Sequence, residues 1–185
     1  GFMLPGTPTD SAGKPLVDAP TSMANAEDRL FVQLIGAGGQ AEVALAKLAE
    51  SKGSTDKVRG FASRMIRDHG KANDELAQLA GTAGIALPDE PMPAHRAAEA
   101  RLRELDGTRF DVAYLRNQLM EHQKAVTLLE WEINSGQHAG LQRFAASTLR
   151  VVLGHLTEAQ RLLGESTGAL PQGLAAAHPA TPAKR

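Results

Sequence analysis

Apolar residues recur at alternating steps of three and four along four long segments of the chain, approximately residues 25–50, 55–80, 109–134 and 139–163. This spacing places the apolar side chains on one face of an α-helix, and its persistence over several turns predicts antiparallel, coiled-coil-like packing. The chain shows no strand-like alternation of apolar and polar residues. The pattern therefore predicts an all-α bundle of four helices.

Several residues mark where the predicted helices begin and end. Asn25, with an acidic residue three positions on, predicts a capping box for the first helix, and the pair 54–55 can cap the second. Thr108 with Asp111 predicts a similar cap for the third helix, and Gly164 predicts the end of the fourth. The apolar line of the fourth helix comprises Leu141, Ala145, Leu149, Val152, Leu156, Ala159 and Leu163.

The lengths of the connections indicate the topology. Short turns around residues 52–53 and 135–136 join the helices into two hairpins, whereas residues 81–108 form a much longer link. That link carries Pro88, Pro91 and Pro93 and then a short helical stretch at about residues 94–105. Two helical hairpins joined by a long crossover with a short extra helix predict an all-α, ferritin-like four-helix bundle.

The composition of the two ends predicts three regions. Residues 1–25 are rich in glycine, proline and small polar residues and predict a flexible N-terminal segment. Residues 26–165 form the predicted bundle domain, and residues 166–185 predict a disordered tail. The start of the chain lacks the basic and apolar regions of a signal peptide, and no segment is apolar enough to predict a transmembrane helix.

Charge and composition exclude several classes of function. The 185 residues carry 20 lysines and arginines against 21 acidic residues, a net charge of −1, and only 4% are aromatic. No nucleic-acid partner is therefore expected. The absence of cysteine excludes disulfides, thiolate metal sites and covalent haem attachment.

Short motifs follow one another in a recognisable order across residues 26–165. They are Gly39-Gln40-Ala41-Glu42-Val43, Leu48-Ala49, Val58 to Ala62, Arg64-Met65-Ile66-Arg67-Asp68-His69, Asn73, Leu76, Phe110-Asp111-Val112-Ala113-Tyr114, His122-Gln123-Lys124-Ala125-Val126, Phe144-Ala145, Thr148-Leu149 and His155-Leu156. Their order and spacing resemble a bacterial family called domain of unknown function 4142, often labelled predicted outer membrane protein. The resemblance implies an exported ferritin-like bundle, periplasmic or associated with the outer membrane, whose signal peptide is not in this chain. The family usually has a proline after the Thr-Leu pair, and this chain has Arg150 there.

Three histidines and one glutamate form the candidate metal site. His69 and His122 lie on the apolar lines of the second and third helices, each fourteen residues after its predicted start. A long crossover makes these two helices parallel, so the two imidazoles are expected at a similar depth. His155 reaches a nearby level on the fourth helix, and Glu42 lies at the edge of the first. Such a set predicts a site for a late first-row metal such as zinc, copper, nickel or iron.

The same histidines have a structural interpretation as hydrogen-bonded members of the core. Leu156 fits the apolar line of the fourth helix better than His155 does. Asp68, next to His69, is expected to face solvent or a neighbouring helix. A di-iron site is not predicted, because Glu-x-x-His motifs are missing: Ile66, Leu119 and Val152 stand three residues before the histidines. No pair of axial haem ligands is predicted either.

The leading functional hypothesis is a cell-envelope binding protein that holds or sequesters a divalent transition metal. The alternative is a non-catalytic structural or stress-related interaction module, in which the histidines only specify packing. A metal-dependent redox enzyme is a third hypothesis. No catalytic residues are predicted, because no nucleophile or phosphate-binding motif occurs. The expected oligomeric state is monomer or dimer.

Overall fold

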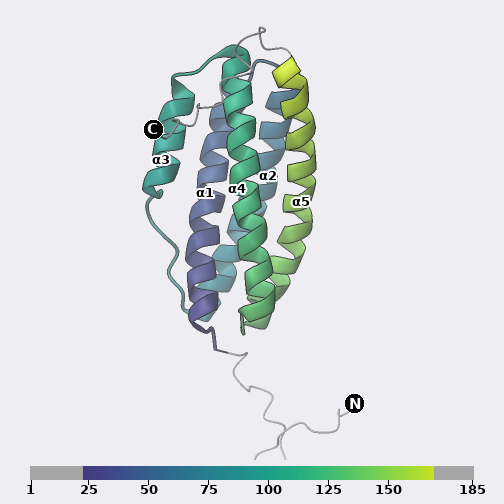
Figure 1. The fold of residues 1–185 in the computed structure, drawn as a ribbon. Coiled ribbons are helices and arrows are strands. Elements are labelled where there is room, and N and C mark those ends of the chain that lie inside the picture. The colour runs from purple at the N-terminus through teal and green to yellow at the C-terminus, as the bar shows by residue number, and fades with distance from the viewer. Residues whose placement is uncertain (1–22, 169–185) are drawn as a thin grey trace, which may run out of the picture.

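The computed structural model describes residues 23–168, which form five helices (Figure 1). They are α1 (Ala26–Lys52), α2 (Asp56–Ala83), α3 (Pro93–Arg103), α4 (Gly107–Ser135) and α5 (Ala139–Gly168). Helices α1 and α2 form one antiparallel hairpin, and α4 and α5 form the other. Residues 84–106, including α3, run back along the outside of the bundle to the start of α4. This is the predicted ferritin-like arrangement of two hairpins and a crossover.

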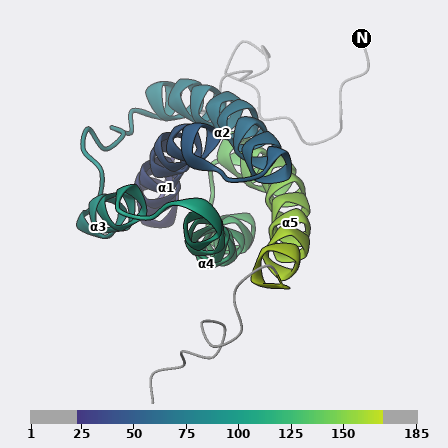
Figure 2. The same ribbon diagram turned by 90° about the horizontal axis from the view of Figure 1, so that it is seen from above.

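The four long helices occupy the corners of a square in the view along the bundle (Figure 2). Helix α1 packs against α2 and α4, and α5 packs against the same two helices on the opposite side. Helices α2 and α4 are therefore diagonal to each other and parallel in direction, as the long crossover predicts. Helix α3 packs on α1 and α4 at the edge of the bundle.

The starts of α1 and α2 confirm the predicted caps. The Asn25 side chain accepts a hydrogen bond from the backbone of Asp28 at 2.8 Å, and Asp28 accepts one from the Asn25 backbone at 2.6 Å. Thr55 caps α2 by accepting a hydrogen bond from the Val58 backbone at 3.2 Å. Most of the predicted N-terminal segment 1–25 and most of the predicted tail 166–185 lie outside the described residues.

The predicted cap of the third long helix is wrong. Helix α4 begins at Gly107, whose φ of 58° is the left-handed conformation that glycine adopts without strain. Asp106 occupies the N-cap position, and its side chain makes no capping hydrogen bond. Asp111 is instead turned toward the α1–α2 connection, where its carboxylate accepts hydrogen bonds from the backbone, at 2.9 Å, and the hydroxyl of Ser54. A contact between elements replaces the local cap.

Helix α5 is longer than its sequence pattern predicts. It continues past Gly164 to Gly168, three residues into the predicted tail. A single exposed glycine costs a helix only about 1 kcal/mol, so it does not have to end the helix. Arg150 lies within this helix, where the family pattern would place a proline.

The apolar core is divided into two clusters. The first cluster lies near the α1–α2 turn and includes Leu45, Phe61, Phe110, Tyr114 and Leu162. The second cluster lies near the α4–α5 turn and includes Phe31, Leu76, Leu129, Leu141 and Phe144.

Between the two clusters, polar residues replace apolar ones on each long helix. They are Glu42, His69, Gln118, His122 and His155. This polar layer is the part of the core that apolar packing does not explain. Along residues 23–168, no helix combines the length and the apolar content that a membrane span requires.

Candidate metal centre

The imidazoles of His69 on α2, His122 on α4 and His155 on α5 face one another within the polar layer. Nε2 of His122 lies 3.3 Å from Nε2 of His69 and 3.2 Å from Nδ1 of His155. One nitrogen from each ring belongs to a group whose atoms all lie within 4.8 Å of one another. The structure thus brings together the three histidines that the sequence predicted.

His155 is the histidine whose position the sequence pattern described least well. It is 1% exposed, whereas Leu156, which the pattern placed in the core, is half-buried. The apolar line of α5 is therefore wrong at this point. Neighbouring positions on a helix differ by about 100°, so a small rotation of α5 decides which of the two residues faces the core.

The outer nitrogen of His122 is fixed by the backbone of its own helix. Nδ1 of His122 lies 2.9 Å from the carbonyl oxygen of Gln118. A carbonyl oxygen can only accept a hydrogen bond, so Nδ1 carries the proton and donates it. In the neutral ring, Nε2 then has no proton and directs a lone pair toward the other two imidazoles.

The outer nitrogen of His155 is fixed by a carboxylate from α2. Nε2 of His155 donates to Oδ2 of Asp68 at 2.9 Å, and Arg64 donates to the same oxygen at 3.3 Å. Burial alone would raise the pKa of Asp68, but these hydrogen bonds hold it below its usual value. Asp68 is therefore an ionised acceptor, and neutral His155 directs the lone pair of Nδ1 inward.

The surroundings favour the neutral form of all three rings. Burial, together with repulsion from the neighbouring imidazoles, lowers the pKa of His69 to about 3. Burial and repulsion from His155 lower the pKa of His122 to about 4, although the Gln118 carbonyl and Glu121 oppose this. Burial also lowers the pKa of His155, although Asp68 opposes this. At neutral pH the lone pairs of His122 and His155 consequently face each other at 3.2 Å with no proton of their own between them.

A single metal ion would relieve this arrangement. Zinc–imidazole bonds of about 2.0–2.1 Å in a tetrahedral site separate two ligand nitrogens by roughly 3.3 Å. The two shorter nitrogen–nitrogen distances in the centre are 3.2 and 3.3 Å. Metal-binding histidines also commonly donate their other N–H to a carboxylate or a carbonyl oxygen, as His155 and His122 do. The spacing of His122 to His69 and to His155 therefore fits a metal ion, and the tautomers of His122 and His155 fit it as well.

Glu42, the fourth predicted ligand, lies outside the group that the three histidines form. It is 5% exposed and contributes to the wall of a cavity that His69 and His122 also line. Burial raises the pKa of Glu42 to about 8, and the nearby Gln118 amide only partly opposes this rise. Glu42 is thus a protonated, buried acid near the centre.

Sequence analysis expected Asp68 to face solvent or a neighbouring helix, and Asp68 does contact α5, but the analysis assigned no role to Asp68 or to the Gln118 carbonyl. Asp68 directly follows Arg67 and precedes His69, so it points about 100° away from the imidazole beside it. That direction leads to α5, because α2 packs against α5 as well as α1. The adjacent Asp-His pair was visible in the sequence, but only the packing of α5 reveals its use.

These features define an all-α, ferritin-like bundle with three histidines gathered at the middle of its core. The chain belongs to the family described as domain of unknown function (DUF4142), whose model matches residues 13–162. No curated protein matches the chain. A crystal structure of a DUF305 fragment from Deinococcus radiodurans has the same fold, with a TM-score of 0.70 and 19% identity over 77% of this chain and 98% of that one.

Proposed function

We propose that this protein binds one late first-row transition-metal ion through His69, His122 and His155 and serves to hold or sequester it. The observation that carries the proposal is the 3.2 Å distance between Nε2 of His122 and Nδ1 of His155, in two rings whose outer nitrogens both contact hydrogen-bond acceptors. The outer nitrogen of His122 donates a hydrogen bond to the Gln118 carbonyl, and that of His155 donates one to Asp68. A core held together only by apolar packing would not require these polar contacts. Two facing lone pairs repel each other, whereas a cation between the rings would be coordinated by both.

The donor set narrows the choice of metal. Three neutral imidazoles suit zinc, copper, nickel and iron(II), and they are poor ligands for magnesium or calcium, which prefer oxygen. A three-histidine set in which two of the nitrogen pairs lie at tetrahedral spacing favours zinc, with copper as the next candidate. An envelope location, periplasmic or at the outer membrane, is part of the proposal and rests on the family resemblance.

The test begins with protein purified without chelator or metal-affinity resin. Elemental analysis, followed by calorimetric titration with zinc, copper, nickel and iron(II), should give a stoichiometry near one. His122→Asn and His155→Asn should abolish tight binding. His138→Asn is the matched control, because His138 caps the start of α5 through a hydrogen bond from the Leu141 backbone and lies outside the group. Equal binding by all the variants, or none by the wild type, would overturn the proposal.

A structural role for the histidines is the second candidate, and the Asp68–His155 pair favours it. A protonated His155 could donate one proton to Asp68 and the other to His122, which would remove the repulsion without a metal. NMR titration of the metal-free protein distinguishes the two functions. A His155 pKa above 7 supports the structural role, and a pKa well below 6.5 supports the metal centre.

The location can be tested separately by fractionating cells that express the complete natural gene. Recovery with periplasmic or outer-membrane markers supports the proposed location. Recovery with cytoplasmic markers contradicts it and leaves the metal-binding proposal untouched.

A further inference from the structure

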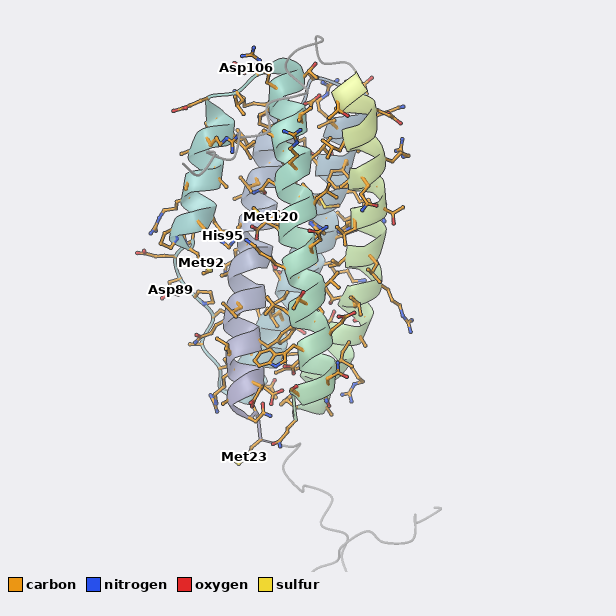
Figure 3. The ribbon with its side chains drawn as sticks, in the orientation of Figure 1. Met23, Asp89, Met92, His95, Asp106 and Met120 are labelled. Atoms are coloured by element: carbon orange, nitrogen blue, oxygen red, sulfur yellow. The ribbon has the colours of Figure 1, made fainter. Side chains whose placement is uncertain are left out.

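A cavity of about 460 Å³ lies beside His69 and His122. Its walls are mainly apolar and include Leu34, Ile35, Leu128, Phe144 and Val152, while His69 and His122 form part of the same lining. Volumes of this order are typical of sites for small organic ligands. Met92 and His95, which also line the cavity, mark its side at the lower end of α3 (Figure 3). Met92 is 41% exposed, so the cavity reaches the surface there.

Gly38 keeps part of this cavity open. A Cβ atom at Gly38 would meet no heavy atom of the described residues within 4 Å, although Gly38 lies in the middle of α1 and lines the cavity. At Gly39, in contrast, a Cβ would collide with the Asn73 side chain. Packing therefore explains Gly39 but not Gly38. A mid-helix glycine is less stable than alanine by about 0.5–1 kcal/mol, and what Gly38 provides in return is space.

Glu42 lies one helical turn after Gly38 on the same cavity wall. It is 5% exposed, and within residues 23–168 its Oε2 atom has no hydrogen-bond partner. A buried polar atom without a partner is costly, so a native site that retains one commonly satisfies it with a ligand or water. In the metal-free protein, burial raises the pKa of Glu42 to about 8, so the carboxyl is protonated at neutral pH and able to donate to an oxygen atom.

The other charged groups of the cavity have partners in the protein. Glu121 accepts a hydrogen bond from Lys124 at 2.9 Å and lies 3.6 Å from His95. These contacts, of which the one with His95 is the largest cause, lower the pKa of Glu121 to about 2. Of the two carboxyls that line the cavity, Glu42 is therefore the one without an ion pair among the described residues.

We propose that the cavity binds a small monocarboxylic acid with an apolar body, whose carboxylate coordinates the metal ion and accepts a hydrogen bond from Glu42. This inference rests on the metal centre proposed above. Three protein ligands leave a coordination position open on a tetrahedral ion. A divalent ion with three neutral imidazoles keeps a charge of +2, which favours an anion, and the apolar walls favour a hydrocarbon body.

The test uses the full chain loaded with cobalt(II), whose visible absorption responds to a change of ligand. Benzoate and hexanoate should shift the spectrum saturably, whereas acetate, which lacks an apolar body, and benzamide, which lacks the charge, should bind at least tenfold more weakly. Gly38→Leu should fill the cavity and weaken benzoate binding tenfold or more while cobalt stoichiometry stays near one. Gly60→Leu is the matched control, because Gly60 is an exposed α2 glycine with open space around it.

A second variant protects the test against a folding defect in Gly38→Leu. Glu42→Met removes the hydrogen-bond donor at similar volume and should weaken benzoate binding about tenfold, whereas Glu42→Gln, which can still donate, should retain most of it. If cobalt binds but benzoate leaves the spectrum unchanged, the inference is overturned and the metal centre stands. The same conclusion follows if benzoate binds Gly38→Leu and Glu42→Met as tightly as it binds the wild type. If cobalt does not bind, both proposals fail.

Discussion

At the residue scale, the aspartate behind His155 sets the direction of that imidazole. Asp68 accepts the Nε2 proton of His155 at 2.9 Å and so keeps Nδ1 free to face the other rings. Asp68→Asn should weaken zinc binding by about 10–100-fold, the usual effect of losing such a support, while the helical content stays unchanged. Calorimetric titration measures this. Asp74→Asn, an exposed change on the same helix, should leave the affinity unaltered, and an equal loss in both variants would contradict the role of Asp68.

The depressed pKa values of the histidines predict how acid affects the metal-free protein. The pKa of His122 is about 4 and that of His69 about 3, both below the ordinary value of 6.5. The unfolded chain therefore binds protons that the native state does not, and the histidines' contribution to the unfolding free energy falls as pH drops from about 6.5 toward 3–4. Urea denaturation with a chelator present, at pH 7, 6 and 5, should show a smaller acid loss for His122→Asn than for the wild type. Parallel curves would contradict the assignment.

Glu132 predicts the opposite trend on the alkaline side. It is fully buried next to Asp28, and burial together with that neighbouring carboxylate raises its pKa to about 8 from 4.5. The native state holds a proton that the unfolded chain releases, so the contribution of Glu132 to stability is lost as pH rises from about 4.5 to 8. Glu132→Gln should gain stability relative to the wild type between pH 6.5 and 8 in denaturation curves. The control Glu130→Gln, at an exposed position, should show the same dependence of stability on pH as the wild type. A pH dependence of Glu132→Gln parallel to that of the wild type would contradict this account.

At the element scale, Asp111 ties the start of α4 to the connection before α2. It is 1% exposed and accepts two hydrogen bonds from Ser54. Asp111→Ala leaves the Ser54 backbone N–H without this partner and should lower the unfolding free energy by about 1–3 kcal/mol. Denaturant titration measures the change. Asp106→Ala, which removes an exposed ion pair with Lys52, should lower the unfolding free energy much less. Similar decreases in the two variants would contradict the role given to Asp111.

The helices themselves were largely predictable, since steps of three and four fix a helical face wherever one register of apolar residues dominates. The caps at Asn25 and Thr55 were predictable because both act within one turn of their own helix. Asp111 was not, because its partner Ser54 is 57 residues away in sequence. His155 and Leu156 offered competing registers on α5, and only the packing of α5 between α2 and α4 decides between them.

At the scale of the whole molecule, topology made part of the site predictable. His69 and His122 share a depth because the long crossover makes α2 and α4 parallel. The rest of the site depends on lateral packing: Asp68 meets His155 across the α2–α5 contact, and Glu42 shares a cavity with two histidines without joining their group. Sequence spacing determines depth along a bundle, but it does not determine the rotation of one helix against another.

The division of the core into two apolar clusters predicts where a bound metal should stabilise the bundle. The three histidines lie between the clusters and connect α2, α4 and α5, whereas α1 and α3 supply none of them. Binding to the native state alone stabilises it by about 2.7 kcal/mol at a free metal concentration 100 times the Kd. Local opening at the middles of α2, α4 and α5 breaks the coordination, so hydrogen exchange should slow there more than in α1.

Hydrogen–deuterium exchange with and without zinc measures this, and His122→Asn is the control in which zinc should change no helix. Equal slowing across all five helices would mean that metal binding stabilises the bundle only through global unfolding. Slowing confined to the surface of one helix would place the ion outside the core. Slowing centred on the polar layer of the three histidine-bearing helices is the result that the two-cluster core requires, because these helices can separate locally only by giving up the shared ion.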